Sequence, residues 1–424
     1  MRHESCTRPS LTQQTQSTQI LLEIIDYSSW SLGIKQRVGG RRVPLAGTLE
    51  LTRRCNHRCR HCYNNLPAGD AAAEAQELGT SEVRRILDEM AASGCVWLLF
   101  TGGEIFLRPD FLEIYIYAKE KGFLITLFTN GTLITPQLAD EMERRRPFAI
   151  EITLYGATPE TYERVTGVPG SFGRCLQGIR YLRDRGLPLK LKSMVLTLNR
   201  REVWDMKRLA EEELGLSFRF DAMLNPRCDC SQSPLAVRLS PEEVVALDLM
   251  DPERINALRE FAGRFSQTRT IGQQSDGLYV CGGGAYSFAV DPYGSLRMCV
   301  LSPEEGFDLR RGSFQAGWDQ FLSRERDRKI DRKSKCVRCA LRLLCGMCPA
   351  NGALECGDPQ QPVDFLCRVA HLRAHALGWD VAPHGECEYC KKKLKTSAAL
   401  EERPAESQDL RSGTARLEER TCGP

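Results

Sequence analysis

The sequence lacks the features of a membrane, secreted or nucleic-acid-binding protein. No apolar run approaches the roughly 20 residues that a membrane-crossing helix needs. The best early candidate, residues 20–25, is short and interrupted by Glu23. The start of the chain has no long apolar segment with a small-residue cleavage site, so no secretory signal is expected. A net charge of +3 gives no reason to expect nucleic acid or a membrane surface as a partner. We therefore expect a cytoplasmic protein.

Cysteine, in contrast, is abundant, with 19 among 424 residues. A reducing compartment disfavours structural disulfides, so closely spaced cysteines predict metal or iron–sulfur ligands. The thiols gather near Cys55 and between Cys281 and Cys367. These two regions are the candidate sites.

The chain divides into five segments by composition. Hydrophobic residues make up 42% and charged residues 27%, an ordinary balance for a globular protein. A capping box, Ser240 to Glu243 with Pro241 at the first helical position, predicts a helix in the bridging segment. The predicted segments are an N-terminal arm or cap (1–44), an α/β core (45–222), a bridging helical segment (223–280), a small cysteine-rich domain (281–376) and a charged, disordered tail (377–424).

Strand-like and helix-like stretches alternate within residues 45–222. Apolar spacing predicts a helix over 81–93, and Thr135-Pro136 and Thr158-Pro159 are helix starts with a capping hydroxyl before proline. Strands are expected at 48–51, 96–100, 124–128, 149–154, 189–196 and 218–220. This alternation predicts an α/β fold with a parallel sheet, a partial barrel of six βα units. Functional residues then belong at the C-terminal ends of the strands.

The first cysteine group, Cys55, Cys59 and Cys62, follows the first predicted strand. Three thiolates in a compact loop can hold three irons of a [4Fe–4S] cluster and leave the fourth iron for a cofactor. The alternative is a zinc site that takes His57 or His61 as a further ligand.

The end of the second strand favours the cluster. Gly102-Gly103-Glu104 follows this strand, one βα unit after the cysteine loop. Glycines there let the backbone approach a ligand closely because no Cβ stands in the way.

In these two motifs the sequence resembles the radical S-adenosylmethionine (SAM) superfamily over roughly residues 45–222. Cys55, Cys59 and Cys62 match its cysteine signature, and Tyr63 is the aromatic residue that commonly follows it. Gly102, Gly103 and Glu104 match the motif whose backbone receives the methionine amino group, although Ile105 stands where many members have proline. The resemblance implies reductive cleavage of SAM at the open iron. The resulting 5′-deoxyadenosyl radical abstracts a hydrogen atom from the substrate.

Two further positions are candidates for contact with SAM. By position, Thr153 and Lys192 match residues that contact its ribose and carboxylate. The alternatives are an ordinary strand residue for Thr153 and a solvent-facing side chain for Lys192. Asn130 follows the third strand, where it can close a turn with Gly131.

The second cysteine group lies between residues 281 and 367. Asp291 to Gly294 reads as a tight turn, so Cys281 and Cys299 can meet across a hairpin. Zinc knuckles and iron–sulfur clusters both suit the remaining spacing. The remaining cysteines of this group are Cys336, Cys339, Cys345, Cys348 and Cys367.

In context this pattern resembles the SPASM extension, an auxiliary-cluster domain of many radical SAM peptide-modifying enzymes. The resemblance implies two auxiliary clusters, and it departs from the family only in having two residues, not three, between Cys345 and Cys348. One [4Fe–4S] cluster would take Cys336, Cys339, Cys345 and Cys367, and the other Cys281, Cys299 and Cys348. The fourth ligand of the cluster at Cys281, Cys299 and Cys348 is open. Cys228 and Cys230 are candidates, and Cys356 is a spare thiol.

We assign none of the other cysteines to a cluster. Cys387 and Cys390 can act as ligands, but their place in the charged tail favours exposed thiols. Cys6, Cys95, Cys175 and Cys422 have no cysteine neighbours in sequence and are interpreted as structural or incidental.

The resemblance implies an oxidoreductase that modifies a ribosomally made peptide or small protein, with a flavodoxin- or ferredoxin-type electron donor. Sulfatase maturation ranks lower, because Val300 stands where those enzymes usually carry aspartate. One alternative is radical chemistry on a small molecule such as a cofactor, porphyrin-type or carbohydrate substrate. Another is a zinc-binding interaction protein without catalysis.

Overall fold

The computed structural model describes residues 27–267, 276–331, 334–339, 341–342, 344–379, 381 and 387–391. The chain forms two compact units, Met1–Arg41 and Arg42–Pro424. In the first, the described part is helix α1 (Tyr27–Val38), which is followed by two glycines with positive φ angles. The predictions for most of the N-terminal arm, for Cys6 and Cys422 and for most of the tail concern positions outside the described residues.

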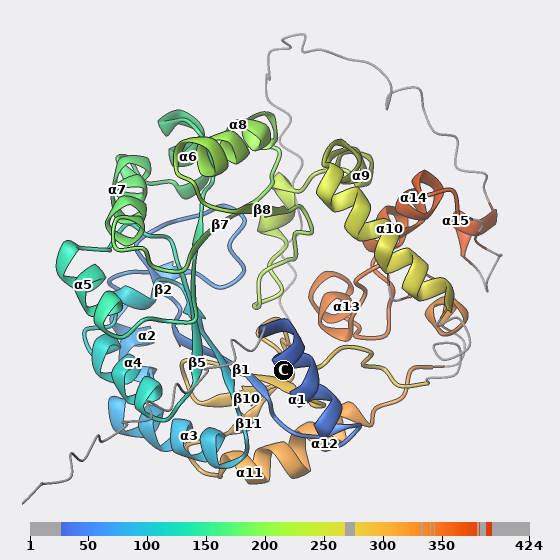
Figure 1. Ribbon diagram of the computed structural model, residues 1–424. Coiled ribbons are helices and arrows are strands. Elements are labelled where there is room, and N and C mark those ends of the chain that lie inside the picture. The colour runs from blue at the N-terminus through green and yellow to red at the C-terminus, as the bar shows by residue number, and fades with distance from the viewer. Residues whose placement is uncertain are drawn as a thin grey trace, which may run out of the picture. The chain divides into compact units, whose positions relative to one another are not determined.

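A nine-stranded sheet organises the second unit (Figure 1). Its order is β11-β10-β9-β1-β4-β5-β6-β7-β8. In this order, the strands from β9 through to β8 at the far edge pair in parallel. At the other edge, β10 pairs antiparallel with β9, and β11 pairs antiparallel with β10. The strands are β1 (Ala46–Thr52), β4 (Trp97–Gly102), β5 (Leu124–Thr129), β6 (Ala149–Thr153), β7 (Leu189–Met194), β8 (Phe218–Asp221), β9 (Ser287–Val290), β10 (Ser295–Arg297) and β11 (Phe307–Asp308). A separate pair, β2 (Arg54–Cys55) and β3 (Leu66–Pro67), flanks the first cysteine loop.

The six strands predicted for the core are confirmed, and so is the α/β fold. They are β1, β4, β5, β6, β7 and β8, each within two residues of its expected bounds. Their apolar side chains are buried almost completely, as at Leu49, Phe100 and Leu191. This burial, common to neighbouring parallel strands, makes their sequences read as short apolar runs.

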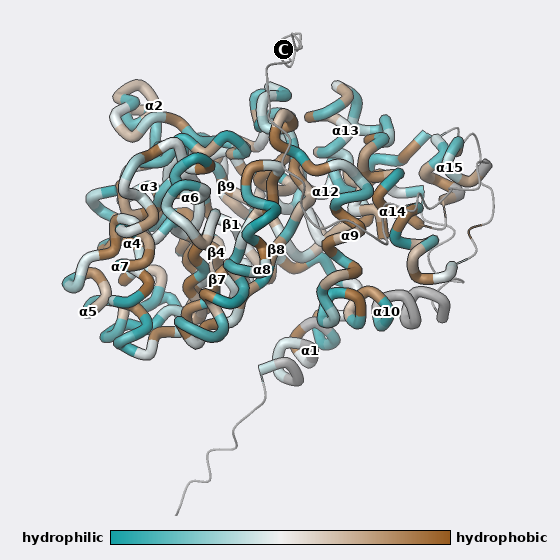
Figure 2. The backbone as a smooth tube through the Cα atoms, turned by 90° about the horizontal axis from the view of Figure 1, so that it is seen from above, coloured by the Kyte–Doolittle hydropathy of each residue, from teal (hydrophilic) through white to brown (hydrophobic). Residues whose placement is uncertain are grey.

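Helices connect and cover these strands. Figure 1 shows α3, α4, α5 and α7 in a row on one side of the core strands, and in Figure 2 the helices carry both teal and brown residues, as expected of elements that bury one face. The core helices are α2 (Ala71–Gln76), α3 (Thr80–Ala92), α4 (Phe111–Glu120), α5 (Pro136–Arg144), α6 (Pro159–Thr166), α7 (Ser171–Arg183) and α8 (Val203–Arg208). The later helices are α9 (Pro241–Met250), α10 (Pro252–Gln267), α11 (Phe314–Ala316), α12 (Ser323–Arg326), α13 (Pro349–Cys356), α14 (Asp364–Ala376) and α15 (Glu388–Lys391).

The predicted helix starts are also confirmed. The hydroxyls of Thr135, Thr158 and Ser240 each accept a hydrogen bond from a backbone N–H of the first helical turn. Among the described residues, we find no helix with the length and apolar character that crossing a bilayer requires.

Strands of the cysteine-rich region join the sheet of the core. The sequence did not predict this pairing. The tight turn is present: the Asp291 carboxylate accepts the backbone N–H groups of Tyr293 and Ser295, and Gly294 has a φ of 90°. The hairpin that this turn forms pairs in parallel with β1 through β9. Since β9 has four residues and its partner lies more than 200 residues earlier, no local pattern reveals this pairing.

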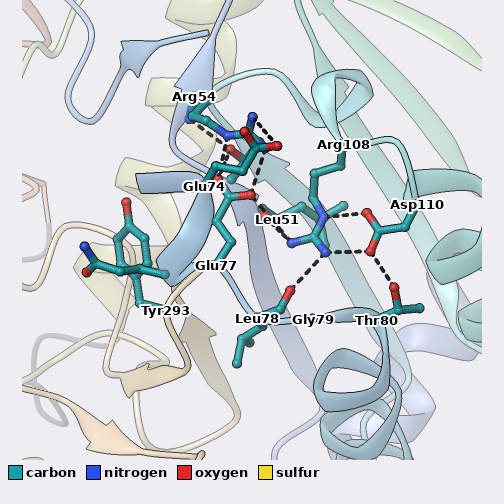
Figure 3. A network of polar contacts seen from close by, with 12 residues as sticks. Leu51, Arg54, Glu74, Glu77, Leu78, Gly79, Thr80, Arg108, Asp110 and Tyr293 are labelled. Carbon is teal, nitrogen blue, oxygen red and sulfur yellow. Dashed lines mark hydrogen bonds and ion pairs between the residues drawn. The ribbon is translucent and has the colours of Figure 1, made fainter. Parts of the chain in front are cut away.

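A buried ionic network fixes the segment that precedes the first cysteine (Figure 3). The Arg54 guanidinium makes two hydrogen bonds of 3.0 Å to the Glu77 carboxylate, and both side chains are 6% exposed. Arg54 also pairs with Glu74, whose side chain is 53% exposed. Arg108 binds Asp110 through two hydrogen bonds of 2.9 and 2.7 Å. It also donates to the carbonyls of Leu51 and Leu78, and this ties β1 to the start of α3.

We expect Glu77→Ala to lower the free energy of unfolding by about 3 kcal/mol, because it leaves the buried Arg54 charge without its main partner. The matched control is Glu74→Ala, which removes an exposed partner of the same arginine and should cost about 1 kcal/mol or less. Denaturant unfolding of the two apoproteins measures the difference. Equal losses would show that Arg54 does not depend on the buried pair.

Candidate active site

A cavity of about 490 Å³ lies at the C-terminal ends of the core strands. Its size is in the usual range for small-molecule and cofactor sites. Its lining includes most of the predicted core-site residues: Cys55, Cys59, Cys62, Tyr63, Gly102, Gly103, Thr153 and Lys192. Glu104 is the exception and does not line it.

The three cysteines of the loop are partly buried. Burial raises the pKa of the Cys55 thiol to about 12, and it also raises the pKa values of Cys59 and Cys62. Buried thiols stay protonated at neutral pH unless a cation stabilises the thiolates, and metal binding therefore releases their protons. The donor set thus fits a metal or an iron–sulfur cluster.

The spacing of the ligand atoms favours a cluster over a single zinc ion. One zinc ion holds its sulfur ligands at about 2.3 Å, so its ligand atoms crowd together. Among the described residues, no three of the ligand atoms of Cys55, Cys59, Cys62, His57 and His61 lie within 4.8 Å of one another. Thiolates that bind different irons of a cubane lie further apart, which suits this loop.

The two histidines of the loop are neutral and lie against the site, where His57 is buried and His61 partly buried. Burial lowers the pKa of both His57 and His61 to about 4. Within the described part of the chain, neither ring nitrogen of His57 has a hydrogen-bond partner, and His57 lines the cavity. Unsatisfied polar atoms at a cavity wall indicate a place for a polar ligand.

The paired glycines approach a different partner from the one that we expected. A Cβ on Gly102 would lie 2.0 Å from the carbonyl oxygen of Thr52, and one on Gly103 would lie 2.2 Å from that of Arg54. The backbone N–H of Gly103 donates to Thr52 (2.7 Å), and that of Glu104 donates to Arg54 (2.9 Å). Glycine is therefore required by the contact between the end of β4 and the segment after β1. This contact aligns the cysteine loop, and both glycines still line the cavity.

Glu104 holds the neighbouring strand end in place. Its carboxylate accepts hydrogen bonds from the Thr129 hydroxyl (2.7 Å) and from the backbone N–H groups of Asn130 (2.8 Å) and Phe106 (3.2 Å). Burial raises its pKa to about 7. The side chain thus positions the ends of β4 and β5 relative to each other.

Tyr63 links the loop to β1. Its hydroxyl donates to Glu50 at 3.0 Å, and the amide of Asn64 donates to the same oxygen at 2.6 Å. Glu50 is 2% exposed, and burial raises its pKa although Arg53 opposes this shift. The end of the cysteine loop is therefore anchored to the strand from which the loop begins.

Lys192 faces the cavity, so the solvent-facing interpretation is wrong. Its side chain is 18% exposed, and its ammonium lies 3.2 Å from Glu151 and over the ring of Phe128. Burial lowers its pKa to about 7, against the opposing effect of Glu151. Thr153 lines the cavity on the adjacent strand, paired with Lys192 in the parallel register.

Asn130 does more than close a turn with Gly131. Its side-chain oxygen accepts the backbone N–H of Thr132 (2.9 Å), as in the predicted turn. Its side-chain nitrogen donates to Asn56 in the cysteine loop (2.8 Å). Tyr155, which the sequence analysis missed, lines the cavity, and its ring lies 4.9 Å from that of His61 between ring centres, tilted by 59°. The sequence could have indicated Tyr155 through its position, because it stands two residues after Thr153, just beyond the end of β6.

The later cysteines fall into two groups. Cys336, Cys339, Cys345 and Cys367 line one small cavity. Cys348 lies with the other group: burial raises the pKa of its thiol to about 11, and the charges of Cys299 and Cys281 add to this. The shortened spacing before Cys348 therefore does not separate it from Cys281 and Cys299.

Cys228 lies between the two sites. Its backbone N–H donates to the Tyr63 carbonyl (2.9 Å), and its thiol donates to the carbonyl of Val300 (3.3 Å), next to Cys299. Cys95 and Cys175 are buried in the core, in agreement with a structural role.

Cys387 is not an exposed thiol, and that interpretation is wrong. Its exposure is 1%, because residues 387–391 lie against α14 instead of extending into solvent. Cys390 is partly buried in the same segment. A highly polar stretch that begins at Lys391 follows the two positions, so tertiary packing decided their burial.

The chain is similar to several known proteins. The sequence model of the radical SAM superfamily matches residues 49–210. An AdoMet-dependent heme synthase of Methanosarcina barkeri is 28% identical over 73% of this chain and 92% of its own length. A PqqA peptide cyclase of Ruegeria pomeroyi is 34% identical over 42% of this chain, and the match spans less than half (46%) of that relative. The crystal structure of Streptococcus suis SuiB bound to precursor peptide SuiA has a TM-score of 0.59 at 14% identity, over 80% of this chain and 79% of that one, which indicates a shared fold.

The fold and the site define an α/β enzyme with a cysteine-lined cavity at the ends of its strands. Residues 49–210 match the radical SAM superfamily, so this part of the chain is a radical SAM domain. Its cofactors are those of the family, a [4Fe–4S] cluster and SAM.

Gly103→Ala should reduce the iron and sulfide bound after anaerobic reconstitution, because the new Cβ meets the Arg54 carbonyl and displaces the cysteine loop. Gly69→Ala is the control, since a Cβ there meets nothing within 4 Å. Iron and sulfide analysis of both variants provides the comparison. Full cluster loading in Gly103→Ala would contradict the proposed role of this contact.

Lys192→Met should change how stability depends on pH. The pKa of Lys192 is about 7 in the folded protein, below its ordinary value of 10.5, so the unfolded chain binds the proton more tightly. Its contribution to stability therefore rises as pH increases from about 7 towards 10.5 and is lost as pH falls through that window.

Unfolding of the apoprotein at about pH 7 and about pH 9 measures this difference. We expect Lys192→Met to gain less stability over this interval than the parent, whereas Lys190→Met, at an exposed position of the same strand, should match it. Identical pH dependence in all three proteins would show that Lys192 is not perturbed by the cavity.

Proposed function

We propose that this chain cleaves SAM reductively and modifies a ribosomally made peptide by hydrogen abstraction. The observation that carries the proposal is one cavity whose lining unites the three loop thiols, the paired glycines and Lys192. Cytoplasmic surroundings would keep the thiols reduced, and a flavodoxin- or ferredoxin-type protein would supply the electron.

Cys55, Cys59 and Cys62 would hold three irons of the cluster. When bound, cluster and SAM together supply a 5′-deoxyadenosyl radical. The protein contributes orientation, a dry cavity and a fixed loop. Asn130 and Glu104 help to fix the cysteine loop, because they tie the end of β5 to this loop and to β4.

The remaining predicted contacts suit the polar ends of SAM. The backbone of Gly102 and Gly103 lines the cavity beside the loop, where it can receive the methionine amino group. Lys192 presents an ammonium that would pair with the carboxylate, and Thr153 a hydroxyl for the ribose. Tyr63 completes the wall next to Cys62.

The cavity also has an apolar side that suits an organic substrate. Val300 and Leu301, next to Cys299, meet Met194 at the end of β7 and Met223, two residues after β8, around the same space. The cysteine-rich region therefore contributes directly to the wall at which a substrate would lie. A peptide is favoured as substrate because one relative is a PqqA peptide cyclase and SuiB, of similar fold, was crystallised with its precursor peptide.

We assign the later cysteines to two auxiliary clusters. Cys336, Cys339, Cys345 and Cys367 would bind one, and Cys281, Cys299 and Cys348 the other. Cys228 is our candidate for the fourth ligand of the second, because its thiol lies beside Val300. The clusters would transfer electrons between the substrate and the electron donor.

A small-molecule substrate is the second candidate. The observation in its favour is the similarity to an AdoMet-dependent heme synthase over 92% of that protein's length. Formation of 5′-deoxyadenosine distinguishes the two: a candidate peptide should accelerate it in the first case, and a porphyrin in the second.

Replacing Cys55, Cys59 and Cys62 together with alanine should abolish SAM cleavage and leave the iron of the later cysteines in place. The physical reason is that the two sets of thiols occupy separate cavities. Chromatographic detection of 5′-deoxyadenosine, with iron analysis of the same sample, tests this. Cleavage that persists in the triple variant would rule out this loop as the catalytic site.

A further inference from the structure

A histidine and two cysteines outside the proposed cluster sites share one location. His371 lies on α14, and the short helix α15 packs against α14. Cys387 directly precedes α15, and Cys390 lies within it. Their ligand atoms all lie within 4.8 Å of one another, and within the described part of the chain this is the one such group of three or more.

The distances within the group match those of a tetrahedral ion. The Nε2 atom of His371 is 3.2 Å from the Cys390 sulfur and 3.6 Å from the Cys387 sulfur. With Zn–S bonds of about 2.3 Å and Zn–N bonds of about 2.0 Å, tetrahedral geometry places nitrogen and sulfur about 3.6 Å apart. Two thiolates and one imidazole are also a ligand set that zinc prefers.

The orientation of His371 is that of a metal ligand. Its Nδ1 lies 2.7 Å from the backbone carbonyl oxygen of Cys367, to which it can only donate. In the neutral ring this leaves Nε2 without a proton and directs its lone pair toward the two sulfurs. A hydrogen bond from the other ring nitrogen commonly fixes the tautomer of metal-binding histidines.

The segment that carries the thiols is held against α14. The Tyr389 hydroxyl donates to Asp364 at 2.6 Å, and the ring of Tyr389 lies 5.4 Å from that of His371. Cys387 is 1% exposed and His371 5% exposed. The group is therefore built on a fixed scaffold and is largely shielded from water.

The group adjoins a cluster cavity but differs from it. His371 and Cys387 also border the cavity of Cys336, Cys339, Cys345 and Cys367, whereas Cys390 does not. Those four thiols do not form a group of ligand atoms within 4.8 Å, as expected for thiolates on different irons. Among the described residues, only the set of His371, Cys387 and Cys390 has ligand atoms close enough together for a mononuclear site.

We propose that His371, Cys387 and Cys390 bind a single zinc ion. Water occupies the fourth position. The ion ties the segment 387–391 to α14 and so closes one side of the neighbouring cluster cavity. The inference does not rest on the proposed reaction, because its test measures metal content and not SAM cleavage.

The experiment is metal analysis of the full chain, purified without oxygen with its clusters in place. We expect one zinc ion per chain in the parent protein, loss of that zinc in His371→Gln and Cys390→Ser, and unchanged iron and sulfide in both. His375→Gln is the matched control, since His375 lies one turn further along α14 with an exposed side chain. It should retain the zinc.

Zinc-edge X-ray absorption of the parent protein is a second measurement that needs no variant. Two sulfur ligands and one imidazole nitrogen are expected. Absence of zinc from the parent protein, or a four-sulfur environment, would overturn the proposal. Loss of iron and sulfide instead of zinc in Cys387→Ser would also overturn it, because Cys387 would then be a cluster ligand.

Discussion

The candidate site depends on the close approach of two backbone segments, residues 52–54 after β1 and Gly102–Glu104 after β4. Carbonyl oxygens of the first segment occupy the space where a side chain on Gly102 or Gly103 would begin. Two backbone hydrogen bonds hold the segments together. On one side, the buried Arg54–Glu77 pair fixes the entry to the cysteine loop, and on the other, Glu104 fixes the end of β5. The loop thiols therefore gain their positions from the ends of three neighbouring strands.

Burial sets the chemistry of this arrangement. The thiols of the loop carry raised pKa values, and the two loop histidines carry lowered ones, so the site without its metal is a set of neutral groups. Such a site gains most from a cationic centre that takes up thiolates. Val300 and Leu301 complete the cavity wall, so the cysteine-rich region lines the same cavity as the loop thiols, an arrangement consistent with β9 pairing directly with β1.

Local patterns were sufficient for the core and insufficient for long-range contacts. Apolar runs and Thr-Pro caps predicted the six core strands and the helix starts, because both are set by neighbouring residues. The paired glycines were recognised, but their immediate partner, a backbone segment some 50 residues earlier, was not. The solvent-facing alternative for Lys192 and the exposed-thiol interpretation of Cys387 were wrong for the same reason: the elements that bury these residues, β6 with Phe128 and α14, lie elsewhere in the sequence.

The central claim is that three thiolates hold a cubane whose fourth iron accepts SAM. Electron paramagnetic resonance of the dithionite-reduced, oxygen-free protein tests it most directly. The account predicts a [4Fe–4S]⁺ signal that shifts on addition of SAM and disappears when Cys55, Cys59 and Cys62 are replaced. A spectrum unchanged by SAM, together with zinc in place of iron and sulfide at this loop, would contradict it.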